Sequence, residues 1–201
     1  PNKKLSDSQL ITLQNVSSWN LGCSLLKAGD FDLGWKLYDH GLRAPAEGAQ
    51  RWQRSLYKPF SFARVPIWRG ESLKGKRLLL LGEQGIGDSM MFITCVPKLL
   101  REGATISIVV PQRLKNIYTR SLPNCIILGE KDMRGKSPSP DNYDIQIPLG
   151  SVLQYRFTSL NDYGKDAALL KPDEERVKKL RNKYGTDKPL VGISWQGGGK
   201  G

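Results

Sequence analysis

The chain has 201 residues, of which 39% are hydrophobic and 25% are charged, as is typical of a globular domain of ordinary size with an appendage. Its apolar runs are too short to span a bilayer and no signal peptide is recognisable, so we expect a cytoplasmic protein without a transmembrane segment. The net charge of +12 favours anionic partners, but the basic residues are scattered and form no nucleic-acid-binding motif, so nucleic acid is not the expected partner.

The few cysteine and histidine residues argue against metal and disulfide chemistry. Cys23, Cys95 and Cys125 are widely spaced and odd in number, which favours reduced thiols. His40 is the single histidine, so no histidine-based zinc site can be assembled. Acid–base chemistry must therefore fall to carboxylates, lysine or tyrosine, and we expect neither a metal nor a cofactor.

Two helical stripes of apolar residues occupy the N-terminal segment, one over residues 8–28 and one from Phe31 to Leu42. Gly29 and Asp30 separate them, which predicts a helical hairpin as a first domain, residues 1–45. Residues 46–75 are irregular, with several prolines and aromatic residues, and we expect them to form a connector packed on the domain that follows.

From residue 76 to 201 the patterns of strand and helix alternate. This predicts an α/β domain with a Rossmann-like, doubly wound parallel sheet and helices on both faces. The expected strands span residues 77–82, 105–110, 125–128, 143–147 and 190–195. The expected helices lie near residues 87–101, 112–120, 149–156 and 173–184, and residues 129–141 are expected to form a mobile loop.

The turn after the first expected strand is the strongest candidate for a functional site, because ligands of open α/β sheets bind beyond the carboxyl ends of the strands. Residues 82–89 read Gly-Glu-Gln-Gly-Ile-Gly-Asp-Ser. The spacing of Gly82 and Gly87 resembles a P-loop, but Asp88 occupies the position of the phosphate-binding lysine, which excludes a Walker ATPase. The order G-x-x-G-x-G also differs from the dinucleotide fingerprint.

Two interpretations of Asp88 remain open at this point. A carboxylate at the start of a helix is favoured in its ionised form and can act as a general base. Alternatively, Asp88 only caps the helix. The backbone amides of Gly85 to Gly87 are placed to hold an anionic group of a substrate.

Two sets of residues resemble known families. Trp19-Asn20-Leu21-Gly22, Gly29-Asp30-Phe31, Gly34 and Tyr38 resemble one tetratricopeptide repeat. The second set resembles the glycosyltransferase domain, related to family 9 (the heptosyltransferases), that some bacterial repeat proteins carry. It comprises Pro66-x-Trp68-x-Gly70, the run from Glu83 to Asp88, Phe92, and Gly192-Ile193-Ser194-Trp195-x-Gly197.

The second resemblance implies the N-terminal, acceptor-side half of a GT-B fold, within an inverting glycosyltransferase whose nucleotide-sugar donor is a substrate. Asp88 matches the proposed catalytic base of heptosyltransferases. The implied substrate-binding residues are its neighbours Glu83, Gln84, Gly85, Ile86, Gly87 and Ser89. The acceptor would be a glycan, a lipid-linked sugar or a protein, and the repeat helices would offer a surface for a protein partner.

The alternative function is a non-catalytic scaffold, in which a helical protein-binding module precedes a degenerate glycosyltransferase domain. The sequence stops where the donor-binding half of a GT-B fold is expected to begin. We therefore expect residues 1–201 alone to be inactive and the intact protein to carry any transferase activity.

Overall fold

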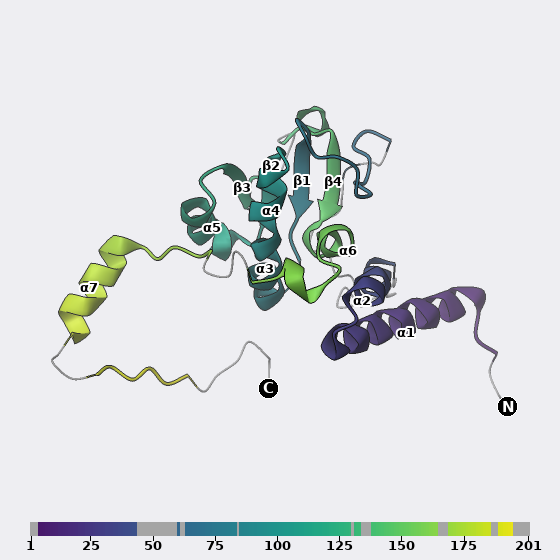
Figure 1. Cartoon of the computed structure of the whole chain (residues 1–201), viewed down its shortest axis with the longest axis horizontal. Coiled ribbons are helices and arrows are strands. Elements are labelled where there is room, and N and C mark those ends of the chain that lie inside the picture. The colour runs from purple at the N-terminus through teal and green to yellow at the C-terminus, as the bar shows by residue number, and fades with distance from the viewer. Residues whose placement is uncertain are drawn as a thin grey trace. The chain divides into compact units, whose positions relative to one another are not determined.

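The computed structural model contains two compact units, residues 1–170 and residues 171–201. Figure 1 shows the elements in chain order. The structure describes residues 4–43, 60, 63–83, 85–129, 131–133, 138–164, 169–185 and 189–194.

A four-stranded parallel sheet forms the centre of the first unit (Figure 1). Its strands lie in the order β3-β2-β1-β4, and their bounds are β1 Arg77–Leu81, β2 Thr105–Val110, β3 Cys125–Gly129 and β4 Ile145–Pro148. The register aligns Leu80 with Ile108 on one side and with Ile147 on the other. This arrangement confirms the predicted α/β class and the Rossmann-like parallel sheet. The chain moves outward from β1 to β3 and then returns to β4, so the topology switches between β1 and β4.

Helices connect the strands, as the alternating pattern predicts. Between β1 and β2 lie α3 (Ile86–Phe92), the 3-10 turn η3 (Ile93–Cys95) and α4 (Val96–Arg101). The single helix expected near residues 87–101 is therefore interrupted. Pro97 explains the interruption, because it lacks an N–H group and its ring crowds the carbonyl group four residues earlier. The later elements are η4 (Gln112–Leu114), α5 (Lys115–Ser121), η5 (Pro140–Asn142), η6 (Leu149–Val152), α6 (Leu153–Arg156) and η7 (Leu160–Asp162).

Alternate residues of β1 belong to two apolar clusters. Leu78 and Leu80 pack in the main core, which also takes residues from α3, α4, α5 and α6. Leu79 and Leu81 belong to a smaller cluster with Val65 and other residues outside the helices. We expected helices on both faces, but within the described part of the chain the helices contribute to the main core alone.

The buried side chain of Gln146, in β4, attaches the connector to the sheet. Its Nε2 donates to the carbonyl groups of Phe60 (2.9 Å) and Val65 (2.6 Å), and its Oε1 accepts from the N–H of Phe60 (2.9 Å). The backbone of Gln146 also pairs with Pro66 and Trp68. Residues 60 and 65–68 of the connector thus contact β4, whereas residues 44–59 and 61–62 lie outside the described residues.

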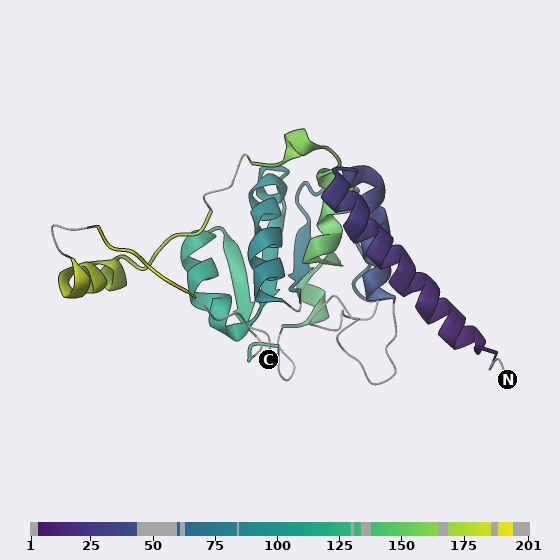
Figure 2. The ribbon, with the colours of Figure 1, turned by 90° about the horizontal axis from the view of Figure 1, so that it is seen from below.

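The N-terminal helices form the predicted hairpin, in which α1 (Asp7–Ala28) lies alongside α2 (Phe31–Tyr38) and the 3-10 turn η1 (Asp39–Leu42) follows (Figure 2). Ser6 and Gln9 build a capping box at the start of α1, and Gly29 ends this helix with a left-handed φ of 90°. A Cβ atom at Gly22 would lie 2.7 Å from the backbone nitrogen of Tyr38. The two helices therefore need glycine at this crossing.

The second unit contains α7 (Glu174–Tyr184), which Asp173 caps through the N–H of Arg176. The expected strand over residues 190–195 is wrong for the described residues 189–194, which form no strand. Their apolar side chains remain in water, and Val191 is 83% exposed. A strand needs a hydrogen-bonded neighbour, and the described residues of this unit offer none. Across the described residues, no helix has both the length and the apolar character needed to cross a membrane.

Candidate functional site

The carboxyl ends of β1 and β4 meet at the topological switch point, and Glu83 joins them. Glu83 follows β1 by two residues, and its Oε1 accepts a hydrogen bond of 2.8 Å from the N–H of Gly150, which follows β4. The side chain of Glu83 is buried, with 1% of the residue exposed. The sequence alone did not identify Gly150 as a residue of the candidate site, because its partner Glu83 lies 67 residues away along the chain.

Ser89 supports the same turn from within the protein. Its Oγ donates to the main-chain carbonyl of Glu83 at 3.4 Å, and Ser89 is 1% exposed. Because burying a polar group costs free energy unless it is hydrogen-bonded, these contacts favour one conformation of the turn. The structure thus places the side chains of Glu83 and Ser89 beneath the turn, whereas Gly87 lies on its surface.

Asp88 is the exposed carboxylate of this turn. It is the third residue of α3, and the N-cap position belongs to Gly85. The interpretation of Asp88 as the N-cap residue is therefore wrong. A Cβ atom at Gly85 would collide with the Asp88 carboxylate, which shows that this side chain folds back over the start of the helix. Gln84 lies outside the described residues.

The side chain of Asp88 lies in the first turn of α3 and is exposed. Among the described residues, none makes a hydrogen bond or an ion pair with the Asp88 side chain. Its neighbour Ile86 is partly buried and packs against the main core, which anchors this turn to the sheet. Asp88 can therefore meet a ligand, whereas Glu83 is enclosed.

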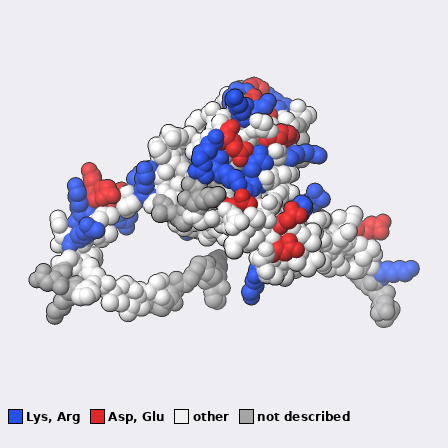
Figure 3. All heavy atoms as spheres, in the orientation of Figure 1, with Lys and Arg blue, Asp and Glu red and all other residues white. Residues whose placement is uncertain are grey.

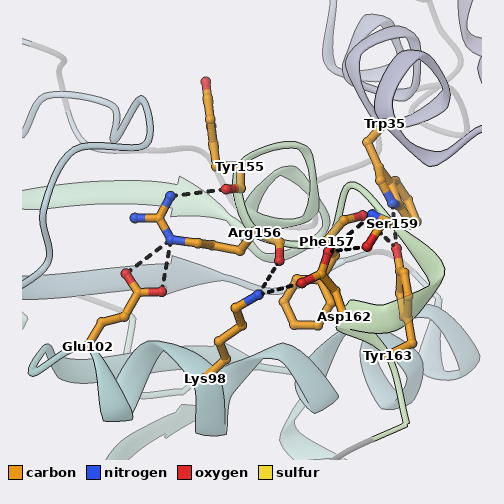
Figure 4. A network of polar contacts seen from close by, with 9 residues as sticks. All are labelled: Trp35, Lys98, Glu102, Tyr155, Arg156, Phe157, Ser159, Asp162 and Tyr163. Carbon is orange, nitrogen blue, oxygen red and sulfur yellow. Dashed lines mark hydrogen bonds and ion pairs between the residues drawn. The ribbon is translucent and has the colours of Figure 1, made fainter.

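The hairpin contacts the same helix that carries Asp88. The rings of Trp35 and Tyr38 each lie 6.0 Å from the ring of Phe92, the last residue of α3. Trp35 Nε1 also donates to the hydroxyl group of Tyr163 at 2.7 Å, and that hydroxyl donates to the carbonyl of Phe157 (Figure 4). The aromatic residues of the second helical stripe thus pack the hairpin against α3 and the segment that follows α6.

Two ion pairs hold the end of α6 and the segment that follows it against α4 and its C-cap residue, and both are drawn in Figure 4. Lys98 Nζ lies 3.0 Å from Asp162 Oδ1, and Arg156 Nε lies 2.9 and 3.0 Å from the carboxylate oxygens of Glu102. Lys98 also donates to the carbonyl of Arg156. Sequence reasoning missed this network, because its partners are 54 to 64 residues apart and no local pattern marks them.

The thiols of the core are unsuited to nucleophilic chemistry. Burial raises the pKa of Cys95, and it raises the pKa of Cys125 to about 12. Because the thiolate is the reactive form, both thiols are inert at neutral pH. Within the described ranges, no three His, Cys, Asp or Glu side chains are grouped so that they could hold a metal ion.

Acidic and basic side chains are mixed on the face drawn in Figure 3. Arg77 pairs with Asp144 at 2.8 Å, and Arg64 pairs with Asp141 at 3.0 Å. The net charge of +12 thus does not produce a single-signed surface on the face drawn in Figure 3.

Comparisons with known proteins give one distant relative. The chain is 27% identical over 187 residues to a protein of Caulobacter vibrioides named Protein FlbA. The match covers 86% of this chain and 30% of FlbA, so the chain spans less than a third of that relative's length. No family model matches the sequence, and no solved structure matches it. The chain is thus similar to part of a longer protein and has a Rossmann-like parallel sheet.

Proposed function

We propose that this chain is the acceptor-side half of an inverting glycosyltransferase that uses a nucleotide-sugar donor. The observation that carries the proposal is the exposed carboxylate of Asp88, in the first turn of the helix that follows β1 at the switch point. Ligands of open α/β sheets bind at this position. The motif from Glu83 to Asp88, which resembles that of heptosyltransferases, adds support from the sequence.

In the proposed reaction Asp88 accepts the proton of an acceptor hydroxyl group. The hydroxyl oxygen forms a bond to the anomeric carbon of the donor sugar, while the bond between that carbon and the phosphate oxygen breaks. The electron pair leaves with the nucleoside diphosphate, and the configuration at the anomeric carbon inverts. A positioned general base contributes about 10²–10⁴-fold to such a proton transfer.

The other residues of the turn take supporting roles in this proposal. Glu83 and Ser89 hold the turn from beneath, and the backbone amides of Gly85 to Gly87 face the anionic group of a substrate. Gln84 and Ile86 complete the substrate-binding segment implied by the sequence. The donor itself would be bound by a second α/β half, as the resemblance implies.

The proposal is tested with the intact protein, of which these residues are a part. Purified protein is incubated with a panel of nucleotide sugars and with glycan, lipid-linked and protein acceptors. We expect release of the nucleoside diphosphate together with a product of inverted anomeric configuration, identified by NMR. Absence of turnover with every donor, or a product of retained configuration, contradicts the proposal.

One observation favours the alternative function, a protein-binding scaffold. The outer side of α1 carries Leu10, Leu13 and Leu21, each about half exposed at 50 to 52%. Apolar residues gathered on a surface mark protein-binding sites. If Leu10→Glu and Leu13→Glu abolish association of the intact protein with a partner, and no nucleotide sugar supports turnover, the scaffold function replaces the enzyme.

A further inference from the structure

Both carboxylate oxygens of Asp39 bind the turn that follows β4. Asp39 begins η1, at the end of the hairpin. Its Oδ1 accepts a hydrogen bond of 2.6 Å from Ser151 Oγ, and its Oδ2 accepts one of 2.7 Å from Gln154 Nε2. The same Nε2 donates to the carbonyl of Ser151 at 3.2 Å. A residue of the hairpin thus clamps η6 to α6 through contacts that span 112 and 115 positions of the sequence.

The clamped turn is the one that meets Glu83. Ser151 directly follows Gly150, whose N–H donates to Glu83, and Ser151 is only 2% exposed. The turn is therefore held on one side by a carboxylate that follows β1 and on the other by a carboxylate of the hairpin. We infer that Asp39 is a positioning residue, which keeps Gly150 against Glu83 and so fixes the β4 side of the switch point.

The turn has little stabilisation of its own. It is a 3-10 helix of four residues, and no side chain caps its start. Short 3-10 helices have poorer hydrogen-bond geometry than α-helices. Hydrogen bonds to an ionised carboxylate are stronger than those between neutral groups. The two hydrogen bonds that Asp39 accepts therefore add to the order that the Gly150–Glu83 bond gives this turn.

The hairpin also reaches the other side of the switch point. Trp35 and Tyr38, four residues and one residue before Asp39, pack against Phe92 at the end of the helix that carries Asp88. The hairpin thus contacts the segments that follow both strands. Asp39 acts through Ser151 and Gln154. Its effect on the order of the turn is independent of the proposed function, whereas an effect on turnover rests on that function.

Amide hydrogen exchange of the full chain tests this inference, with Asp39→Asn as the principal variant. Asparagine keeps one oxygen that can accept from Ser151, but its amide nitrogen cannot accept from Gln154. We expect exchange of the Gly150 amide to accelerate about tenfold in Asp39→Asn and more in Asp39→Ala, because charge-assisted hydrogen bonds are lost. The matched control is Asp32→Asn, which removes the same charge from an exposed residue of the same hairpin.

The Gly129 amide, at the carboxyl end of β3 on the opposite edge of the sheet, provides an internal reference. Its N–H donates to Asp132 Oδ2 at 2.6 Å and is not bonded to Asp39, Ser151 or Gln154. Its exchange should stay within about twofold of wild type in all variants. Unchanged exchange at Gly150 in Asp39→Asn, or equal acceleration at Gly129 and Gly150, overturns the inference.

Turnover by the intact protein separates this inference from the proposed function. If the protein is a transferase, Asp39→Asn should lower kcat/KM about tenfold, while Asp32→Asn leaves it unchanged. If Gly150 exchange accelerates and even the wild type shows no turnover, the proposed function fails and the positioning role stands. If kcat/KM falls while Gly150 exchange stays unchanged, the positioning role is overturned.

Discussion

Glu83 Oε1 accepts a hydrogen bond of 2.8 Å from the N–H of Gly150, and this contact joins the ends of β1 and β4 across the switch point. Glu83 is buried, so the contact is shielded from water. Removing one partner of such a bond leaves the other polar group buried without its partner, which costs more than the bond itself contributes. The contact therefore bears on both the stability and the geometry of the candidate site.

Glu83→Ala should lower the free energy of unfolding by about 2–4 kcal/mol, because it leaves the Gly150 N–H unsatisfied and creates a cavity. Glu83→Gln keeps an oxygen that can accept from Gly150 and should cost only about 1 kcal/mol. Urea denaturation measures both changes. Glu174→Ala, at an exposed position of α7, is the control and should stay within about 0.5 kcal/mol of wild type. Equal losses for Glu83→Ala and the control would show that the contact is unimportant.

Gly85→Ala should disturb Asp88 without a large loss of stability. The backbone φ of −84° at Gly85 suits alanine, but the new Cβ would meet the Asp88 carboxylate. The cost of alanine at an N-cap position is about 1 kcal/mol or less. Transfer by the intact protein should fall, and adding Asp88→Asn should cause little further loss, because both changes act on one carboxylate. If the losses of transfer activity in Gly85→Ala and Asp88→Asn were additive in the double variant, the two changes would not act on the same carboxylate.

Gly87→Ala provides a stability control for that experiment. Nothing lies within 4 Å of a Cβ atom at Gly87, so alanine fits without displacing Asp88. Alanine is a better helix former than glycine, and thermal unfolding should show a gain of up to about 1 kcal/mol. A marked loss of stability would mean that the start of α3 differs from the conformation described.

The pair between Arg77 and Asp144 should make stability depend on acid pH. Hydrogen bonds from Arg77 lower the pKa of Asp144 from 3.8 to about 2. A carboxyl group with a depressed pKa in the folded state stabilises the protein above its unfolded pKa, and this contribution is lost as the pH falls towards 2. Because the pair is partly exposed, the contribution should be under about 1 kcal/mol.

NMR titration of the Asp144 carboxyl group checks this assignment. Arg77→Gln removes the cause of the shift, so the pKa of Asp144 should return towards 3.8. The stability difference between wild type and Asp144→Asn should shrink as the pH falls from about 5 to 2. A stability difference that stays constant over this pH range would show that the Arg77–Asp144 pair does not cause it.

Trp35 should be the main anchor of the hairpin. Trp35→Phe keeps a ring against Phe92 but loses the bond to Tyr163, at a cost of about 1 kcal/mol, whereas Trp35→Ala should cost about 3–5 kcal/mol. Thermal unfolding measures both. Tyr163→Phe combined with Trp35→Phe completes a double-mutant cycle, and additive losses in that cycle would show that the hydroxyl and the indole do not interact energetically.

The sequence predicts local elements better than long-range contacts. The leucine run of β1 and the stripes of the hairpin have periodicities that indicate their elements directly. Glu83 was recognised as part of the candidate site, but its partner Gly150 was not, and neither was Asp39. Their contacts depend on how the strands are ordered in space, which no local spacing encodes.

One further difference has a physical reason. The apolar run at residues 190–195 has the pattern of a strand but no neighbouring strand to pair with in the described part of its unit. The expectation of a mobile loop at residues 129–141 remains a prediction. Within that span, the described residues Asp132 and Asp141 bond to Lys115 and Arg64, and residues 130 and 134–137 lie outside the described residues.

We propose Asp88 as the general base of a transfer reaction, and the single-turnover rate of Asp88→Asn in the intact protein tests this role. Asparagine keeps the size of the side chain but removes the proton acceptor. Asp7→Asn is the matched control, because Asp7 also lies in the first turn of a helix, α1, on the hairpin. We predict a fall of about 10²–10⁴-fold for Asp88→Asn and an unchanged rate for Asp7→Asn. A rate for Asp88→Asn within a few-fold of wild type would show that Asp88 is not the general base.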